Sequence, residues 1–315
     1  MPNYNGVWSL TTQYQYAADW SADNVAPLFD RALFAGGHTS GAVNIIEYVS
    51  IGTLGDVTDF GDLTVARYWF SGLSSLVRGV FGGGNTSGNT MDYVTIASTG
   101  NATDFGDLSE NKARVGTCSS NVRGVFGGGE GSSRLNVMEY ITIASTGNVT
   151  DFGDLTVARD GIAGCGSSTR GVFGGGDLGT SRSNVLDYIT IASTGNASDF
   201  GDLTSARASV AAASNKTRGV WGGGNTTSGA VNTLDYITIA STGNATDFGD
   251  LLAAKTHSSG SASETRALFA GGSDEVNVIQ YITIGSTGDA ADFGDLSGTR
   301  YGIASASAAH GGLQA

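Results

Sequence analysis

Short hydrophobic runs separated by glycine-rich and polar stretches follow one another along most of the chain. Residues 123–126, Arg-Gly-Val-Phe, end in three glycines, and residues 140–143, Tyr-Ile-Thr-Ile, have the β-branched and aromatic content of a strand. Residues 151–155, Asp-Phe-Gly-Asp-Leu, form a third short run, and small residues such as those at 208–214 form a fourth after an arginine. Sustained helical periodicity is missing from this pattern. It therefore predicts units of four short strands and almost no helix.

The same pattern recurs six times. Its Asp-Phe-Gly-Asp-Leu block starts at Asp59, Asp104, Asp151, Asp199, Asp247 and Asp292, so successive units are 45 to 48 residues long. A repeat of this length is a whole supersecondary unit. Four strands in each of six units predict an all-β fold, a six-bladed β-propeller around a central channel.

Several features recur in phase within the repeat. Glycines end the second strand, an aromatic residue lies in the fourth, an Arg or Lys opens the next repeat, and the third strand carries Tyr48, Tyr93, Tyr140, Tyr188, Tyr236 and Tyr281. Together they resemble the kelch family of propeller repeats over residues 31 to about 309. The fourth-strand aromatic is phenylalanine with an added Gly-Asp, where kelch repeats have tryptophan, so the repeat is a divergent, kelch-like one.

The resemblance also predicts how the ring closes. A kelch blade begins with the strand after the arginine, whereas this chain enters its first repeat one strand late, at Arg31. The missing strand is at the far end, in residues 300–309. We expect it to pair beside residues 31–37, which closes six blades and leaves no open edge. The chain is therefore predicted to have two parts, an attachment or oligomerisation segment at 1–30 and a propeller at 31–315.

Residues 1–30 have no counterpart in the repeat and are rich in aromatic residues. Trp8, Tyr14 and Trp20 are the predicted attachment residues. This segment is interpreted either as a strap on its own propeller or as a docking segment for a partner. Residues 68–70, Tyr-Trp-Phe, replace the small residues of other first strands, and the 1–30 segment is the candidate to pack there.

Composition narrows the class of protein. With 40% hydrophobic residues, 50 glycines and 2 prolines, the chain has enough apolar content for a turn-rich folded protein. A net charge of -13 and a pI near 4.4 disfavour binding to nucleic acid and to anionic lipid. Apolar runs are shorter than the ~18 residues of a spanning helix, and the first residues lack a signal-peptide pattern. We expect no membrane insertion.

Cysteine and histidine do not form a metal motif. Cys118 and Cys165 occupy corresponding places in neighbouring repeats and are interpreted as buried thiols, with a disulfide as the alternative. Three scattered histidines make a zinc site improbable. No cofactor is therefore predicted. Calcium at acidic loops such as residues 99–107 is the alternative to simple turn chemistry.

The aspartates of the fourth strand have a second interpretation. Beside simple turn chemistry, the alternative is that they pair with the recurring arginines and so hold each blade to the next. These residues are Asp62, Asp107, Asp154, Asp202, Asp250 and Asp295.

The pattern differs from those of known catalytic propellers. Sialidases share arginines and tyrosines, but here both recur once per blade, as structural residues do, and the Asp-box pattern is absent. Galactose oxidase has histidine and tyrosine copper ligands that three scattered histidines do not match. Nucleophile-elbow, P-loop and metalloprotease motifs are also missing. We predict that the protein is not an enzyme.

The loops between the glycines and the third strand vary from one repeat to the next. Variable loops on a rigid scaffold often carry recognition, and in kelch-like propellers they lie on the face that meets partners. Their first residues are the predicted partner-binding residues: His38, Asn85, Glu130, Asp177, Asn225 and Ser273. Their polar composition suits carbohydrate hydroxyls, and it equally describes solvated turns.

Closely matching repeats such as residues 236–251 resemble kelch-like structural proteins of tailed bacteriophages, and residues 6–10, Gly-Val-Trp-Ser-Leu, resemble segments of phage fibre proteins. The resemblance implies a virion surface protein. Residues 1–30 would contact other virion proteins or sister chains in a homo-oligomer, and the propeller would recognise a host-surface glycan or protein as a tail fibre or receptor-binding component. Capsid decoration and a free carbohydrate-binding or scaffolding propeller are the alternatives.

Overall fold

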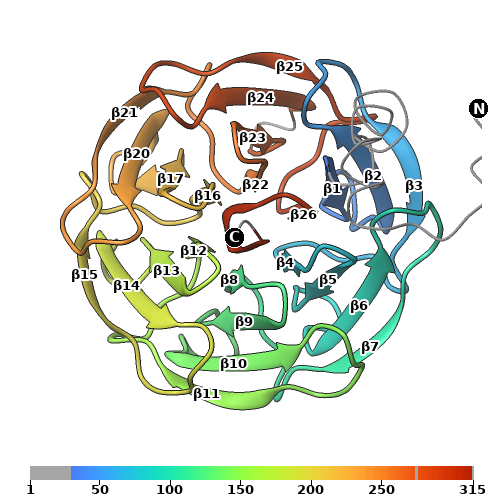
Figure 1. The fold of residues 1–315 in the computed structure, drawn as a ribbon, viewed down its shortest axis with the longest axis horizontal. Coiled ribbons are helices and arrows are strands. Elements are labelled where there is room, and N and C mark those ends of the chain that lie inside the picture. The colour runs from blue at the N-terminus through green and yellow to red at the C-terminus, as the bar shows by residue number, and fades with distance from the viewer. Residues whose placement is uncertain (1–29, 274–275, 314–315) are drawn as a thin grey trace, which may run out of the picture.

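Six four-stranded antiparallel sheets form a ring around a central channel, which Figure 1 shows end-on. The structure, a computed structural model, describes residues 30–273 and 276–313. Each sheet is one blade, and its strands follow one another outward from the channel. The predicted all-β, six-bladed β-propeller is confirmed.

The strands occupy four positions, counted outward, and blades 1 to 6 are numbered by the chain order of their second strands. The innermost strands are β26 (Ala304–Ser307), β4 (Ser71–Ser74), β8 (Gly116–Ser119), β12 (Ala163–Gly166), β16 (Ala211–Ser214) and β22 (Ser259–Ala262). The second strands are β1 (Arg31–Ala35), β5 (Arg78–Gly82), β9 (Arg123–Gly127), β13 (Arg170–Gly174), β17 (Arg218–Gly222) and β23 (Arg266–Ala270). The third strands are β2 (Ile45–Ser50), β6 (Thr90–Thr95), β10 (Val137–Thr142), β14 (Val185–Thr190), β20 (Thr233–Thr238) and β24 (Val278–Thr283). The outermost strands are β3 (Thr58–Asp62), β7 (Thr103–Asp107), β11 (Thr150–Asp154), β15 (Ser198–Asp202), β21 (Thr246–Asp250) and β25 (Ala291–Asp295). A small hairpin, β18 (Asn225–Thr226) with β19 (Gly229–Ala230), extends a loop of blade 5.

The two ends of the ring meet in blade 1. Strand β26 pairs with β1 in antiparallel orientation, so that Ala304 lies opposite Ala35 and Ser307 lies opposite Ala32. Just beyond this pairing, the N–H of Ala308 donates to the carbonyl of Arg31 at 3.3 Å. The predicted closure by the C-terminal strand is confirmed, and it covers an edge of β1 that would otherwise be open to another chain.

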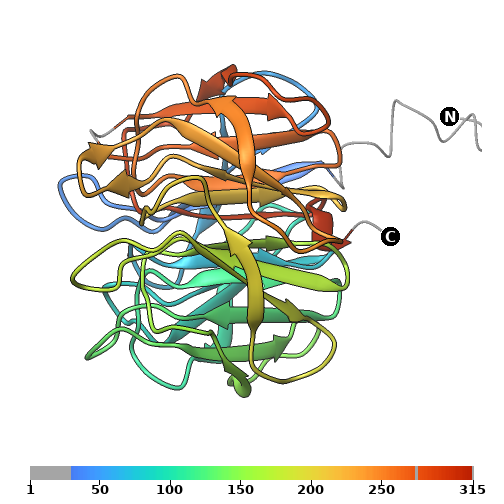
Figure 2. The ribbon, with the colours of Figure 1, turned by 90° about the vertical axis from the view of Figure 1, so that its left-hand side faces the viewer.

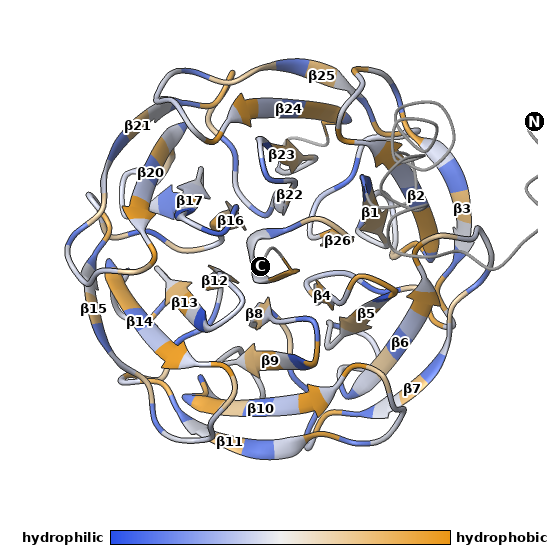
Figure 3. Ribbon diagram, viewed as in Figure 1, coloured by the Kyte–Doolittle hydropathy of each residue, from blue (hydrophilic) through white to orange (hydrophobic). Residues whose placement is uncertain are grey.

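The hydrophobic core lies between neighbouring blades. At the interface of blades 1 and 2, Phe81 of β5 packs with Leu33, Ile46 and Phe60 of blade 1, and each of these is at most 2% exposed. Similar clusters occupy the other interfaces. Hydrophilic stretches are found instead along outermost strands such as β11 and β25 (Figure 3). Each blade therefore depends on its two neighbours for burial of its faces.

The Asp-Phe-Gly-Asp sequence joins each outermost strand to the next blade. In β3, a Cβ added to Gly61 would lie 2.5 Å from the backbone of Gly100 in a turn of blade 2. Beside this contact, the N–H of Asp62 donates to Oδ1 of Asn101 at 3.0 Å. Equivalent bonds to asparagine or aspartate recur around the ring. The glycine is thus required by close approach of backbones, and the turn asparagines accept bonds from the neighbouring blade.

The arginine at the start of each second strand makes another contact between blades. The guanidinium carbon of Arg123 lies 4.2 Å from the ring centroid of Tyr140, and its Nη1 donates to the carbonyl of Ile191 in blade 4 at 3.0 Å. The same pair of contacts occurs at the other second strands. Cation–π attraction and a hydrogen bond therefore recur as structural features of the repeat.

Buried ion pairs hold the residue that opens each repeat. In blade 4, Nη2 of Arg159 lies 2.9 Å from Oδ2 of Asp187 in β14, and both side chains are fully buried. Burial lowers the pKa of Arg159, an effect that the charge of Asp187 opposes. The equivalent pairs are Arg67 with Asp92, Lys112 with Glu139, Arg207 with Asp235, and Arg300 with Glu47.

The acids in these pairs are not the predicted ones. The prediction that the arginines pair with Asp62, Asp107, Asp154, Asp202, Asp250 and Asp295 is wrong, because none of those aspartates forms an ion pair within the described part of the chain. The reason is the path of the arginine side chain. Arg207, for example, precedes the innermost strand β16 and reaches across its own blade to the carbonyls of Trp221 in β17 and Thr233 in β20, where Asp235 of the third strand lies beside it.

Blade 6 departs from the ion-pair pattern. Lys255 opens the repeat, and Gln280 occupies the third-strand position of the acids, opposite the aromatic residue of the second strand. Both side chains are buried, and neither Nζ of Lys255 nor Nε2 of Gln280 has a hydrogen-bond partner among the described residues. Burial lowers the pKa of Lys255.

The ring has two distinct faces. The mouth face carries the loops from second to third strands and the connections that enter each innermost strand. The floor face carries the turns from first to second strands, and it is turned toward the viewer in Figure 1. Asp30 precedes β1 on the floor face, and the short helix η3 (Gly311–Leu313) follows β26 there, at the right of Figure 2. The described chain therefore begins and ends on the floor face.

Candidate binding site at the channel mouth

A closed ring of backbone hydrogen bonds surrounds the channel at the mouth face. This mouth ring has one residue just before each innermost strand: Trp69, Arg114, Gly161, Ser209, His257 and Gly302. The N–H of each residue donates to the carbonyl of its neighbour in the ring at 2.7–3.0 Å. All six have a left-handed φ of 56–65°. Four of them are not glycine, and the ring stabilises this otherwise uncommon conformation.

Aromatic side chains gather on one side of the mouth. This aromatic cluster consists of His38, Tyr68, Trp69, His257 and Tyr301, all partly exposed. The ring of His38 lies 4.7 Å from that of Tyr68 and 5.2 Å from that of Tyr301, and Trp69 stacks on His257 at 5.7 Å. Nδ2 of Asn85 donates to the hydroxyl of Tyr68 at 2.6 Å. Residues from three blades thus form one continuous aromatic surface.

Glycine in the mouth ring makes room for the tryptophan. A Cβ added to Gly302 would lie 2.7 Å from Cδ1 of Trp69. A side chain at position 302 would therefore push the indole away from the ring, in addition to the strain of its left-handed backbone.

Charged side chains occupy the other side of the mouth. This ionic cluster contains Arg114, Glu130, Arg134, Asp160, Asp177 and Arg182. Nε of Arg134 lies 2.9 Å from Oδ2 of Asp160, and its Nη2 lies 3.2 Å from Oδ1 of Asp177. Nη1 of Arg114 lies 3.5 Å from Glu130, while its guanidinium carbon lies 3.9 Å from the ring of Trp69. Arg114 therefore links the two clusters, and the formal charges of the ionic cluster cancel.

The two aspartates of the ionic cluster have opposite environments. Burial raises the pKa of Asp160, although Arg114 opposes this shift. Burial alone would also raise the pKa of Asp177, but the bond from the N–H of Gly179 and the charges of Arg182 and Arg134 together bring it below its usual range. Asp177 is thus the more firmly ionised of the two carboxylates.

His257 is held by two hydroxyl groups. Its Nε2 lies 3.0 Å from Oγ of Ser209, and its Nδ1 lies 2.9 Å from Oγ1 of Thr256. Burial, with a smaller contribution from Arg114, lowers the pKa of His257 to about 4. The imidazole is therefore neutral at pH 7 and connects blade 5 to blade 6.

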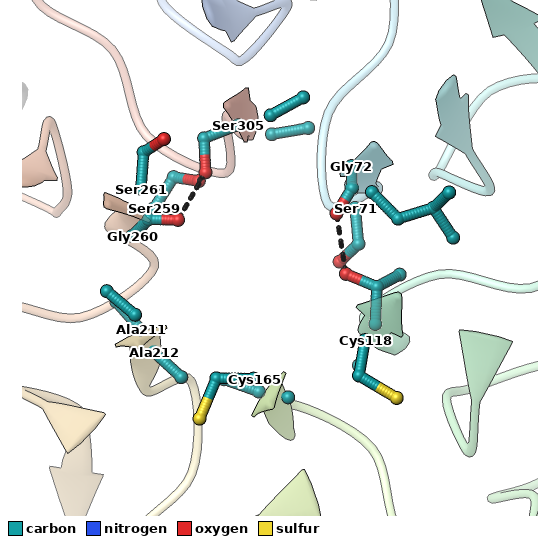
Figure 4. Close-up of a pocket in the computed structure, with 18 of the residues that line it drawn as sticks. Ser71, Gly72, Cys118, Cys165, Ala211, Ala212, Ser259, Gly260, Ser261 and Ser305 are labelled. Carbon is teal, nitrogen blue, oxygen red and sulfur yellow. Dashed lines mark hydrogen bonds between the residues drawn. The ribbon is translucent and has the colours of Figure 1, made fainter. Parts of the chain in front are cut away.

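Below the mouth, the channel is a cavity of about 150 Å³ lined by the innermost strands. Several serine and threonine hydroxyls on these strands bond to neighbouring blades, whereas Oγ of Ser261 on β22 has no hydrogen-bond partner among the described residues. Oγ1 of Thr117 donates to the carbonyl of Gly72 at 2.6 Å, and Oγ of Ser259 donates to Oγ of Ser305 at 2.7 Å (Figure 4). The bonded hydroxyls join neighbouring blades, which gives these small polar residues of the first strands a structural role.

The two cysteines also have structural positions. Figure 4 shows the sulfurs of Cys118 and Cys165 directed away from the centre of the channel. A Cβ added to Gly171 or Gly219 in the neighbouring blade would lie within 3 Å of one of these sulfurs. Burial raises the pKa of Cys118, and it raises that of Cys165 to about 12. The predicted buried thiols are confirmed, and both cysteines are free.

The C-terminal segment contacts the channel at the floor face. Nε2 of His310 lies 3.2 Å from Oγ of Ser119 and 3.3 Å from the carbonyl of Ser74. Burial lowers the pKa of His310 to about 4, although its contact with the Ser74 carbonyl opposes the shift. A Cβ added to Gly311 would lie 2.4 Å or less from carbonyls of blades 4 and 5. Residues 308–313 therefore fit closely across the floor end of the channel.

The structure brings the six predicted partner-binding residues to the rim of the mouth. Each is joined through its backbone to the residue before a mouth-ring residue; the pairs are His38 with Tyr301, Asn85 with Tyr68, Glu130 with Ala113, Asp177 with Asp160, Asn225 with Ala208, and Ser273 with Thr256. His38 belongs to the aromatic cluster, and Glu130 and Asp177 belong to the ionic cluster. The predicted attachment residues, Trp8, Tyr14 and Trp20, lie outside the described residues, as does any contact of the 1–30 segment with Tyr68 and Trp69.

Several residues of the mouth were not predicted from the sequence. Tyr68 and Trp69 were noticed only as a departure from the repeat, and the other missed residues are Arg114, Arg134, Asp160, His257 and Tyr301. A usable signal was present: positions 68, 113, 160, 208, 256 and 301 share one phase of the repeat but carry Tyr, Ala, Asp, Ala, Thr and Tyr. Such variation at a fixed phase marks positions that the fold does not dictate.

Within residues 30–273 and 276–313, no group of three or more His, Cys, Asp or Glu side chains is arranged to hold a metal ion. Across the same residues, no helix is long and apolar enough to cross a membrane. Comparison of the sequence with protein-family models and with curated proteins finds no match.

Proposed function

We propose that this protein is a non-enzymatic virion structural protein that presents its mouth face for host-surface recognition, with a glycan as the favoured target. The observation that carries the proposal is that the two faces of the ring differ. The described chain enters and leaves at the floor face, while the residues that break the repeat gather at the mouth face. Attachment through one face would leave the other turned outward.

The chemistry of the mouth supports a glycan as the target. Partly exposed tyrosines and a tryptophan offer apolar surface, and asparagine, acidic and arginine side chains beside them offer hydrogen bonds. Sugars present both kinds of surface, and rigid aromatic side chains with polar neighbours are suited to bind them. The virion assignment rests on the resemblance of the repeats to kelch-like phage structural proteins. Within that class we favour a tail-fibre or receptor-binding component, and a capsid decoration protein is the alternative.

The ionisable groups of the mouth favour binding over catalysis. The arginines and acids of the ionic cluster neutralise one another, and the imidazole of His257 is engaged by two hydroxyls. Hydrolysis would require an acid, base or nucleophile free to reach a substrate. We therefore propose that the protein binds its ligand without transforming it.

Immunogold electron microscopy tests the proposal. Particles from the source are purified and labelled with antibody against the propeller, and particles treated with pre-immune serum provide the control. Label at tail or fibre ends is the expected result. Label over the head would instead favour a capsid decoration protein, and particles without label would overturn the virion assignment in favour of a free glycan-binding propeller.

A further inference from the structure

The fold does not require aromatic residues in the aromatic cluster. Tyr68 and Tyr301 occupy the same phase of the repeat as Ala113, Ala208 and Thr256. Blades 3, 5 and 6 therefore adopt the same backbone arrangement with a small side chain at this position. Large aromatic side chains left partly exposed at such positions point to a binding role.

The cluster is held in one arrangement by its own contacts. Tyr68 contacts His38 and Trp69 with centroid distances of 4.7 Å, and its hydroxyl accepts the bond from Asn85. Tyr301 lies 6.3 Å from Tyr68 in an edge-to-face arrangement. A surface fixed in this way loses little conformational entropy when a ligand covers it.

The charges around the cluster select the type of ligand. Arg114, which lies over the Trp69 ring, is compensated by Glu130 and Asp160. Among the described residues of the mouth, each arginine of the ionic cluster is paired with an acid, so none is free to hold a carboxylate or sulfate, and the net charge of -13 repels anions. A cationic ligand would have to replace Arg114 on the indole. A neutral ligand with an apolar face fits best.

We propose that the aromatic cluster is a subsite for an uncharged pyranose ring. The C–H face of the sugar packs on Tyr68 and Tyr301, and its hydroxyls bond to neighbouring polar side chains, Asn85 and Glu130 among them. This inference rests on the proposed function and specifies its ligand. It places the contact over the mouth loops of blades 1, 2 and 3 and leaves the floor face, where Ser168 is exposed, outside the subsite.

Saturation-transfer difference NMR on the full-length protein tests the subsite. The neutral probes are maltotriose, cellotriose, mannotriose and galactotriose, and the acidic probes are trigalacturonate and sialyllactose. Two variants, Tyr301→Thr and Tyr68→Ala, each introduce a residue that another blade carries at the same position. Ser168→Ala, in an exposed turn of the floor face, is the control, and thermal unfolding confirms that all variants fold.

We expect at least one neutral trisaccharide to bind, and its affinity to fall by about tenfold in each tyrosine variant but by less than about twofold in Ser168→Ala. Tighter binding of the acidic probes, or neutral binding that survives both tyrosine variants, would overturn the subsite. Failure of every probe to bind the wild-type protein would also overturn it. Immunogold labelling of particle tails is independent of these results, so the proposed function would stand or fall separately.

Discussion

At the scale of single residues, the opening position of each repeat determines how neighbouring blades are joined. Arg159 and Asp187 are both fully buried and 2.9 Å apart. A buried pair of this kind is not a large source of stability by itself, but loss of one partner leaves an uncompensated charge in the interior. The aspartates of the outermost strands have no such role, because their side chains form no ion pair in the described structure.

Replacement of the buried acid should therefore be far more harmful than replacement of the outer one. We expect Asp187→Asn to reduce the free energy of unfolding by about 3–5 kcal/mol, because Arg159 keeps its charge without an anion beside it. Asp154→Asn should change it by less than about 0.5 kcal/mol. Urea unfolding at pH 7 measures both, and equal losses would contradict this assignment of the pairs.

Lys255 provides the complementary prediction. Since it lacks an acidic partner among the described residues, Gln280→Glu should raise the free energy of unfolding by about 1–3 kcal/mol at pH 7. Lys255 has a folded pKa below its ordinary value of 10.5, so the unfolded chain binds more protons between those two values. Wild-type stability should rise with pH in that window, and the variant's should rise less. Denaturant titrations at several pH values measure this rise in both proteins. The same pH profile in the wild type and the variant would refute the prediction.

At the scale of elements, the C-terminal strand and the segment after it have separable roles. Strand β26 supplies the innermost strand of blade 1, whereas residues 308–313 lie across the floor end of the channel. The first role concerns the whole ring, because an unpaired β1 would expose backbone donors and acceptors. The second is local to the floor.

Two truncations distinguish these roles. A chain ending at residue 299 lacks β26 and should form dimers or aggregates through the exposed edge of β1. A chain ending at residue 309 keeps β26 and should keep the association state of the full-length chain, with lower stability. Light scattering coupled to size-exclusion chromatography measures both, and an unchanged association state in the shorter chain would contradict the role of β26.

His310 makes the floor segment sensitive to acid. Its folded pKa of about 4 lies below the ordinary value of 6.5, so the unfolded state binds an additional proton between pH 6.5 and 4. Stability is therefore fully present above pH 6.5 and lost as the pH falls toward 4, by on the order of 3 kcal/mol. His257 has the same sign, so the comparison is made with His310→Gln. Urea unfolding at pH 7 and pH 4.5 should show a smaller loss in the variant; equal losses would exclude His310.

Much of the arrangement of the strands was predictable because the same strand pattern recurs six times in the sequence. The four strands of each blade follow from the Arg-Gly-Val-Phe, Tyr-Ile-Thr-Ile and Asp-Phe-Gly-Asp sequences, and the late start at Arg31 predicted the closing strand. The partner of each arginine was not predictable in this way. Asp187 is 28 residues from Arg159 in the sequence, and its position opposite Phe173 depends on the strand register. Asp154 lies nearer to Arg159 in the sequence, and the sequence alone therefore favoured it as the partner.

At the scale of the whole molecule, the regular repeat forms the ring, and the residues that depart from the repeat lie mainly on the mouth face. Sequence analysis placed recognition at the rim through His38 and its counterparts, but it did not find the aromatic cluster. Tyr68, His257 and Tyr301 are distant in sequence, and only closure of the ring brings the last blades beside the first. Alignment of the six repeats by phase would have identified these positions as exceptional.

The central claim is tested most directly by measuring which face of the ring binds the host cell. Ser40 is exposed on the mouth face and Ser168 is exposed in a floor-face turn, while the native cysteines are buried. Ser40→Cys and Ser168→Cys are each coupled to a maleimide polyethylene glycol, and binding of the full-length protein to host cells is measured by flow cytometry. The account predicts that the polymer abolishes binding at position 40 and leaves it intact at position 168. Binding blocked only at position 168 would contradict the mouth face as the recognition surface.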